Sequence, residues 1–330
     1  MIIAFVSNIL SIRGTEVAMY DYAHYNEILL GNKSIIIAKS YELCENQVDC
    51  HIDVYNKFIK RFPIFYYKNE EDVKRIIHEQ HVDITYIIKG GTYAGGIVLD
   101  RPYKSIVHCV FDTRQPHGTI YTPISDYLNI TNNTSYPVLP HMIHIHNTSN
   151  NFRTLLGIPE SAIVFGTYSG ANQFNIEYIK NAVINISNDP QYDNIYFIFM
   201  NIIPFAPPNK HLLFLPGTPD LEVKRTFINT CDAMLYGRGE GETFGLSCGE
   251  FSICNKPVIA CSVPVFYNTI SRFHLDVLND DAILHTNYNE LYTILTNWKL
   301  YNKDVSNNGY KKYTPEYVMS IFKEMINSII

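Results

Sequence analysis

Residues 237–260, GRGEGETFGLSCGEFSICNKPVIA, carry most of what the sequence says about the fold. The apolar run 233–236 predicts a strand before them, residues 243–254 a helix, and residues 257–261 a second buried strand. Glycine lets the backbone approach a ligand closely, and the free amides at a helix N-terminus attract an anion. The stretch therefore predicts a strand–loop–helix–strand unit with an anion site where its helix begins.

Two carboxylates stand in this stretch, Glu242 and Glu250. On one helix a spacing of eight residues separates them by about two turns, one at the mouth of the site and one inside it. Carboxylates accept hydrogen bonds from paired hydroxyls, so the pair suits a ligand that has a ribose or hexose beside a phosphate. The same pair also fits a helix that binds nothing, with one Glu facing the dipole and the other facing solvent.

Outside this stretch, short apolar runs alternate with helical periods along the whole chain, which predicts parallel sheets covered by helices on both faces. Residues 131–151 are rich in Asn, Thr, His and Pro and show no period, so we place a domain boundary near residue 150. Strands are expected at 2–6, 34–38, 83–88, 105–110, 162–166, 195–200 and 211–215, and helices at 15–30, 70–79, 173–186, 221–229, 289–298 and 315–329. The fold class is α/β, with two Rossmann-like doubly wound domains.

The composition of the chain disfavours several classes of protein. The 330 residues carry a net charge of −6, which disfavours a nucleic-acid partner. The longest apolar runs are too short to form a transmembrane segment, although peripheral membrane contact stays open. Seven cysteines without a CxxC pair predict reduced thiols and a cytoplasmic protein rather than a disulfide framework or a zinc site. The excess of Asn, Ile and Tyr is typical of an AT-rich genome, such as that of a large DNA virus, a parasite or a low-GC bacterium.

Residues 242–260 resemble the signature of the retaining glycosyltransferases of family 4, which have the GT-B fold. That signature has a Glu, then Phe-Gly-Leu, a second Glu eight positions after the first, and Lys-Pro-Val-Ile-Ala at its end, as here. The resemblance implies two facing domains, with acceptor binding by residues 1–150 plus the C-terminal helix 314–330, which crosses back to the first domain. Residues 151–313 would bind the nucleotide-sugar donor.

The resemblance also implies an activity: metal-independent transfer of a sugar, with retention of configuration, from a nucleoside diphosphate sugar to a hydroxyl of a carbohydrate or glycoconjugate. No cofactor or metal is expected. His108, toward the carboxyl end of an apolar strand, and Glu242 would be catalytic. Amides near Gly245 and Leu246 would hold the diphosphate, and Glu250 would hold the ribose. The residues expected to bind the donor are Gly14, Ser169, Arg225, Arg238, Thr243, Phe244, Gly245, Leu246 and Glu250.

One departure from the family concerns the diphosphate. Family members carry an Arg and a Lys after the first strand of the second domain, whereas residues 167–173 here contain neither. We expect Arg225 to replace them, with Arg238 and then Arg13 as the next candidates. Two other functions stay open: a non-catalytic nucleotide- or sugar-binding module, and a nucleotide-sugar epimerase on the same fold.

Overall fold

The computed structural model describes residues 1–46, 50–94, 96–97, 99, 102–262, 271–302, 305 and 308–330. The chain divides into two compact units. Unit 1 comprises Met1–Met142 and Tyr313–Ile330, and unit 2 comprises Ile143–Lys312. The C-terminal segment therefore belongs to the first unit. No helix in the described part of the chain combines the length and the apolar character needed to cross a bilayer.

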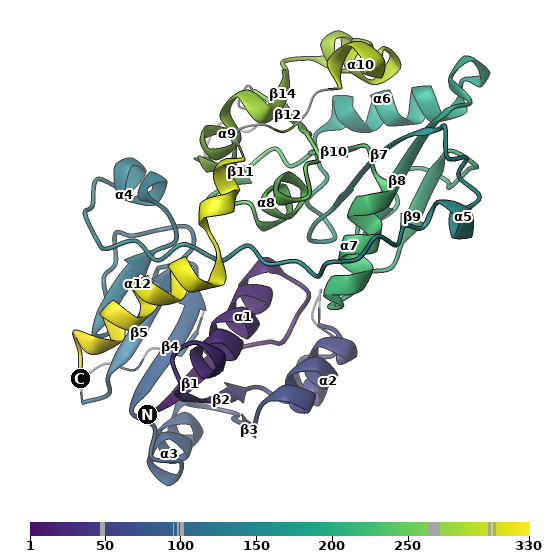
Figure 1. The fold of residues 1–330 in the computed structure, drawn as a ribbon. Coiled ribbons are helices and arrows are strands. Elements are labelled where there is room, and N and C mark those ends of the chain that lie inside the picture. The colour runs from purple at the N-terminus through teal and green to yellow at the C-terminus, as the bar shows by residue number, and fades with distance from the viewer. Residues whose placement is uncertain are drawn as a thin grey trace. The chain divides into compact units, whose positions relative to one another are not determined.

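Unit 1 is built on a six-stranded parallel sheet with the strand order β3-β2-β1-β4-β5-β6 (Figure 1). Ala4 in the middle of β1 is paired with Ile35 of β2 on one side and Thr85 of β4 on the other. Its elements are β1 (Ile2–Ser7), α1 (Gly14–Ile28), β2 (Lys33–Ala38), α2 (Ile52–Arg61), β3 (Ile64–Tyr66), α3 (Glu70–Glu79), β4 (Ile84–Lys89), β5 (Ser105–Cys109), β6 (Ile120–Pro123), α4 (Asp126–Asn132) and α12 (Pro315–Asn327).

Unit 2 repeats this topology with the order β14-β12-β10-β7-β8-β9. The helices α6 and α10 pack on one face of the sheet, and α7 and α8 lie on the other (Figure 1). Its elements are α5 (Arg153–Leu156), β7 (Ile163–Tyr168), α6 (Glu177–Asn188), β8 (Ile195–Met200), β9 (Leu212–Leu215), α7 (Leu221–Thr230), β10 (Ala233–Leu235), β11 (Gly241–Glu242), α8 (Leu246–Ile253), β12 (Val258–Cys261), β13 (Ser271–Arg272), α9 (Phe273–Leu278), β14 (Ala282–His285), α10 (Tyr288–Thr296) and α11 (Trp298–Tyr301).

Side-chain caps explain where several helices begin. Asn69 accepts a hydrogen bond from the amide of Asp72 at the start of α3, and Asp220 does the same for Glu222 at the start of α7. Thr314 caps α12, with Pro315 in its first turn. These short polar residues satisfy amides that have no partner within the helix. The start predicted for α12 from Thr314 and Pro315 is confirmed.

The boundary between the units lies at residues 142 and 143 rather than near residue 150. Residues 143–151 have no regular structure, but they are fixed to unit 2. The side-chain amide of Asn229, on α7, donates to the backbone oxygens of Thr148 and Asn150, both at 2.8 Å. Long-range hydrogen bonds of this kind leave no signal in sequence periodicity, so the polar composition alone misplaced the boundary.

Candidate nucleotide-sugar site in unit 2

The start of α8 lies at the carboxyl end of β10, beside β7, where the strand order of the sheet reverses. Ligands of doubly wound sheets bind at such a point. Gly245 is the N-cap residue, with φ at +86° and no side-chain cap. This left-handed backbone ends the preceding segment and starts the helix at Leu246 rather than at Thr243 as expected. The first amides of α8 are therefore available to a ligand.

Glu242 lies outside the helix, which corrects the expectation that both carboxylates share it. It belongs to β11, which pairs with β13, because Gly245 separates it from α8. Arg238 Nη1 donates to Glu242 Oε2 at 3.0 Å, and the Tyr236 hydroxyl lies 3.5 Å from Oε1. Burial raises the pKa of Glu242, while the Arg238 guanidinium opposes that rise. The carboxylate is held in one place beside the start of α8.

The loop before Glu242 is fixed by Asn175. Its side-chain oxygen accepts from the amide of Gly239 at 2.8 Å, and its nitrogen donates to both carboxylate oxygens of Glu240 at 3.0 and 3.1 Å. Arg238 also lies 3.6 Å from Glu240, so two carboxylates share its charge. The preorganised loop orients Glu242, and it leaves Arg238 as part of an ion-pair network rather than as a separate phosphate-binding cation.

Glu250 is on α8 as predicted, and it is almost completely buried. The hydroxyl of Tyr168, at the end of β7, donates a short hydrogen bond to its Oε2. Among the described residues nothing donates to the other oxygen, Oε1. Tyr168 therefore orients the carboxylate and leaves one oxygen for a ligand hydroxyl.

Arg225 does not reach the amide end of α8. Its Nη1 contacts the sulfur of Cys254, the residue that ends this helix. Residues 246 and 254 of a helix are about 12 Å apart along the axis. The phase of α7 turns Arg225 toward the carboxyl end of α8, away from the amides expected to hold the diphosphate.

The remaining expected donor residues of unit 2 are spread around the same helix end. Phe244 is buried and packs against Phe273 and Tyr310, so only its backbone can meet a ligand. Thr243 is half-buried, as is Ser169, whose hydroxyl donates to the oxygen of Gly170 at 3.1 Å. The structure thus brings Thr243, Gly245 and Leu246 together with Glu242, while the side chain of Phe244 is part of the core.

Sequence reasoning missed His274 and Lys224. His274, on α9, is buried against the ring of Tyr236, and its Cβ would lie 3.0 Å from a Cβ placed on Gly245. Burial lowers the pKa of His274 to about 3, which keeps the ring neutral. Lys224 lies on α7 beside Tyr168. Neither belongs to a motif, and only the packing of α7 and α9 reveals them.

In unit 1, His108, which was expected to be catalytic, is completely buried. It lies on β5, an interior strand, and faces α1. The hydroxyl of Tyr86 lies 2.7 Å from its Nδ1, and the rings of Tyr22 and His141 pack around it. Burial lowers the pKa of His108 to about 3. The side chain is part of the packing beneath the carboxyl ends of the strands, and it has no exposed surface for contact with a sugar.

Gly14 begins α1 after the loop that follows β1, and it is exposed. Two residues later Glu16 is nearly buried. It accepts hydrogen bonds from the hydroxyl of Ser11 at 2.6 Å and from that of Thr15 at 2.9 Å. Burial raises the pKa of Glu16 to about 7, although both hydroxyls act against that rise. Through these hydrogen bonds the carboxyl group of Glu16 fixes the loop before α1.

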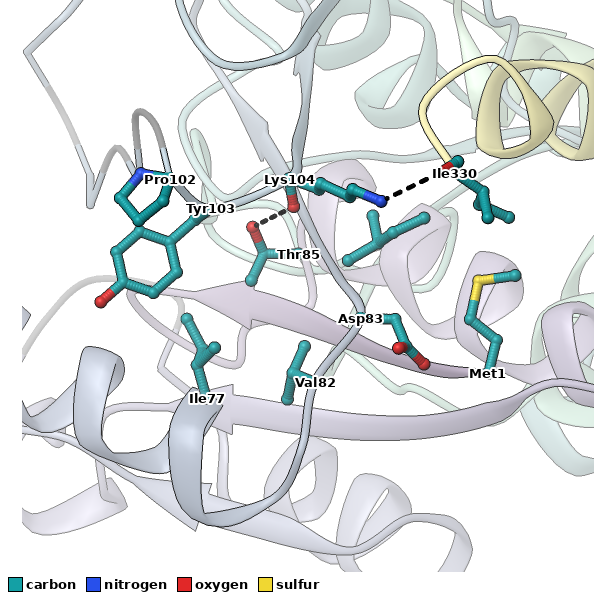
Figure 2. Close-up of a pocket in the computed structure, with 10 residues that line it drawn as sticks. Met1, Ile77, Val82, Asp83, Thr85, Pro102, Tyr103, Lys104 and Ile330 are labelled. Atoms are coloured by element: carbon teal, nitrogen blue, oxygen red, sulfur yellow. Dashed lines mark hydrogen bonds between the residues drawn. The ribbon is translucent and has the colours of Figure 1, made fainter.

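A cavity of about 640 Å³ opens at the opposite edge of the unit 1 sheet. Figure 2 shows Lys104 Nζ donating to the backbone oxygen of Ile330 at 3.3 Å, and the hydroxyl of Thr85 donating to the backbone oxygen of Lys104 at 3.4 Å. Thr85 and Lys104 lie at the amino ends of β4 and β5. Since ligands of such sheets bind at the carboxyl ends, this cavity is not the candidate site.

No group of three or more His, Cys, Asp or Glu side chains in the described ranges is arranged to hold a metal ion. The start of α8 is suited to an anion through its amides and dipole. Metal independence stays a prediction.

The sequence and the fold can be compared with those of known proteins. No protein-family model and no curated protein matches the sequence. Among solved structures, HepE from Anabaena in complex with UDP-glucose has 14% identity and a TM-score of 0.71, covering 99% of this chain and 100% of that one. A glycosyltransferase from Rickettsia africae has 12% identity and a TM-score of 0.69, covering 99% and 98%. WaaG, a glycosyltransferase involved in lipopolysaccharide biosynthesis, has 12% identity and a TM-score of 0.64, covering 99% of both chains. These similarities confirm the expected GT-B fold class.

Proposed function

We propose that this protein is a glycosyltransferase that moves a sugar from a nucleoside diphosphate sugar to an acceptor hydroxyl. One observation carries the proposal: the uncapped amide end of α8 lies between two ordered carboxylates, Glu242 and Glu250. The likeness in fold to HepE, which was solved with UDP-glucose, and to WaaG supports it over nearly the whole chain.

In this proposal the diphosphate lies against the amides that follow Gly245. Negative charge builds up on the leaving diphosphate as the bond to the sugar breaks. Fixed N–H groups and the helix dipole stabilise that charge without rearrangement. Oε1 of Glu250 accepts from a ribose hydroxyl, and Glu242, held by Arg238, accepts from hydroxyls of the transferred sugar.

Retention of configuration and metal independence are the finer parts of the proposal. Retention rests on the resemblance of residues 242–260 to the family 4 signature. Metal independence rests on the start of α8, because amides there can supply the positive potential that a divalent cation would otherwise provide.

We assign the acceptor, a carbohydrate or a glycoconjugate, to unit 1. The loop around Gly14 and the carboxyl ends of β4 and β5 form the edge where a doubly wound unit binds its ligand. His108 lies beneath this edge and is proposed to shape it rather than to touch the reacting atoms.

The proposal is tested by a thermal-shift screen against UDP, GDP, ADP and CDP sugars, because a ligand that binds the folded state raises its melting temperature. The best donor is then incubated with candidate acceptors, and nucleoside diphosphate release and the anomeric configuration of the product are measured. Glu242→Gln should abolish transfer. Glu177→Gln, an exposed change on α6, should leave it intact.

Other outcomes would replace the proposal. Donor binding without transfer to any acceptor favours a non-catalytic binding module. A donor sugar that changes configuration without an acceptor favours an epimerase. Failure of every nucleotide sugar to bind contradicts the proposed site itself.

A further inference from the structure

Lys224 is a largely buried residue whose ammonium group has no matching anion. The residue is only 8% exposed, on α7, and its Nζ lies 5.4 Å from the ring centroid of Tyr168. In the described part of the chain its ammonium group forms no ion pair and no hydrogen bond. The Nζ atom itself keeps some contact with solvent, but a cation held among largely apolar neighbours is poorly hydrated, and contact with an aromatic face offsets this only in part. An anionic ligand beside Tyr168 would supply the opposite charge that the Lys224 ammonium group lacks.

The neighbours of Lys224 link it to the candidate donor site. Tyr168 ends β7, and its hydroxyl donates to Glu250 on α8. The rings of Phe227 and Phe251 pack against Tyr168 and fix its orientation. The ammonium of Lys224 is therefore separated from the Glu250 carboxylate by a single immobilised ring, at the edge where the strand order reverses.

The two arginines near α8 already have partners. Arg238 is paired with Glu242 and Glu240, and Arg225 contacts Cys254 at the far end of the helix. Residues 169–173 contain no Lys or Arg. The backbone of this loop is also closed on itself, since the amide of Gly170 donates to the side chain of Gln173 at 3.2 Å.

We propose that Lys224 binds the nucleotide phosphate adjacent to the ribose, in place of cations on the loop after β7. This inference rests on the proposed function, because it places the ribose at Glu250. In a nucleotide one phosphate is bonded directly to the ribose, so a cation one ring away from the ribose-binding carboxylate is suited to that group. The ligand class is thus a 5′-phosphorylated nucleoside, and the α7 lysine distinguishes it from the bare nucleoside.

The test compares wild type with Lys224→Met, which keeps the unbranched shape and most of the length of the side chain and removes its charge. From UDP, GDP, ADP and CDP, the nucleotide that wild type binds most tightly is selected, together with its monophosphate and its nucleoside. Affinities are measured by calorimetry. Lys180→Met on α6 is the matched control, because Lys180 is a half-buried lysine of the same unit that pairs with Glu177 at 3.4 Å. Lys224→Gln is measured in parallel, in case the methionine variant does not fold.

We expect Lys224→Met to weaken the diphosphate and the monophosphate by roughly 10- to 100-fold, the range of a lost charge-assisted bond. Nucleoside affinity should change less than about threefold, and Lys180→Met should match wild type. Folded Lys224 variants with wild-type affinity for both phosphates would overturn the inference and leave the proposed function standing. An equal loss for the nucleoside would also overturn it, because it would assign Lys224 to packing of Tyr168. Failure of wild type to bind any of the nucleotides would instead refute the proposed function.

Discussion

Replacement of Gly245 by alanine tests the start of α8 most sharply. At φ +86° an L-residue is strained, which costs about 1–2 kcal/mol. The new Cβ would also lie 3.0 Å from the Cβ of His274 and 3.1 Å from the Tyr310 hydroxyl. That hydroxyl cannot move freely, because it donates to the oxygen of Phe244 at 2.5 Å. Strain and crowding together should lower the free energy of unfolding by about 2–4 kcal/mol.

Gly157→Ala is the matched control. Gly157 has φ +67° and belongs to the same unit, but no atom lies within 4 Å of its added Cβ. It should cost only the strain, about 1–2 kcal/mol in urea unfolding. Because Gly245→Ala also displaces the first amides of α8, it should weaken nucleoside diphosphate binding in calorimetry, whereas Gly157→Ala should not. Equal stability of the two variants together with unchanged binding would refute this account of the helix start.

Three further outcomes are expected. Glu250→Ala should weaken nucleoside diphosphate binding by about 1.5–3 kcal/mol, and unchanged affinity in the folded variant would contradict the ribose contact. Transfer should persist in excess EDTA, and a complete loss that magnesium reverses would show that a metal is required. Glu16 has its pKa raised from 4.5 to about 7, so the folded state holds a proton that the unfolded state has lost. Stability should therefore fall by up to about 3 kcal/mol as pH rises across that interval, at about 1.4 kcal/mol per unit. Glu16→Gln should remove the fall, and an unchanged slope in urea titrations at several pH values would exclude this cause.

The layered fold could be predicted from the sequence because apolar runs and helical periods are local signals. Strands such as Ile2–Ser7 and Ile195–Met200 are buried on both faces, so they appear as continuous apolar runs. The helix α2 (Ile52–Arg61) was missed, although Val54, Tyr55 and Phe58 form its buried face. Its N-cap, His51, is not among the residues usually recognised as caps.

The arrangement of the site depended on contacts that the sequence does not display. The eight-residue spacing suggested that Glu242 and Glu250 share a helix, but the left-handed backbone of Gly245 separates them. Neighbouring residues on a helix point about 100° apart, so Lys224 and Arg225 face different neighbours. The sequence alone did not show which of the two faces the site. The burial of His108 follows from the position of β5 inside the sheet, which requires the strand order.

Hydrogen–deuterium exchange at the start of α8 shows whether a nucleoside diphosphate binds there. In the proposed complex the nucleoside diphosphate lies on the amides that follow Gly245, which have no partner within the helix. A saturating nucleoside diphosphate should therefore slow exchange in peptides covering residues 243–250, and the corresponding nucleoside should protect them much less. Protection confined to other segments, with the start of α8 unchanged by a bound nucleoside diphosphate, would contradict the account.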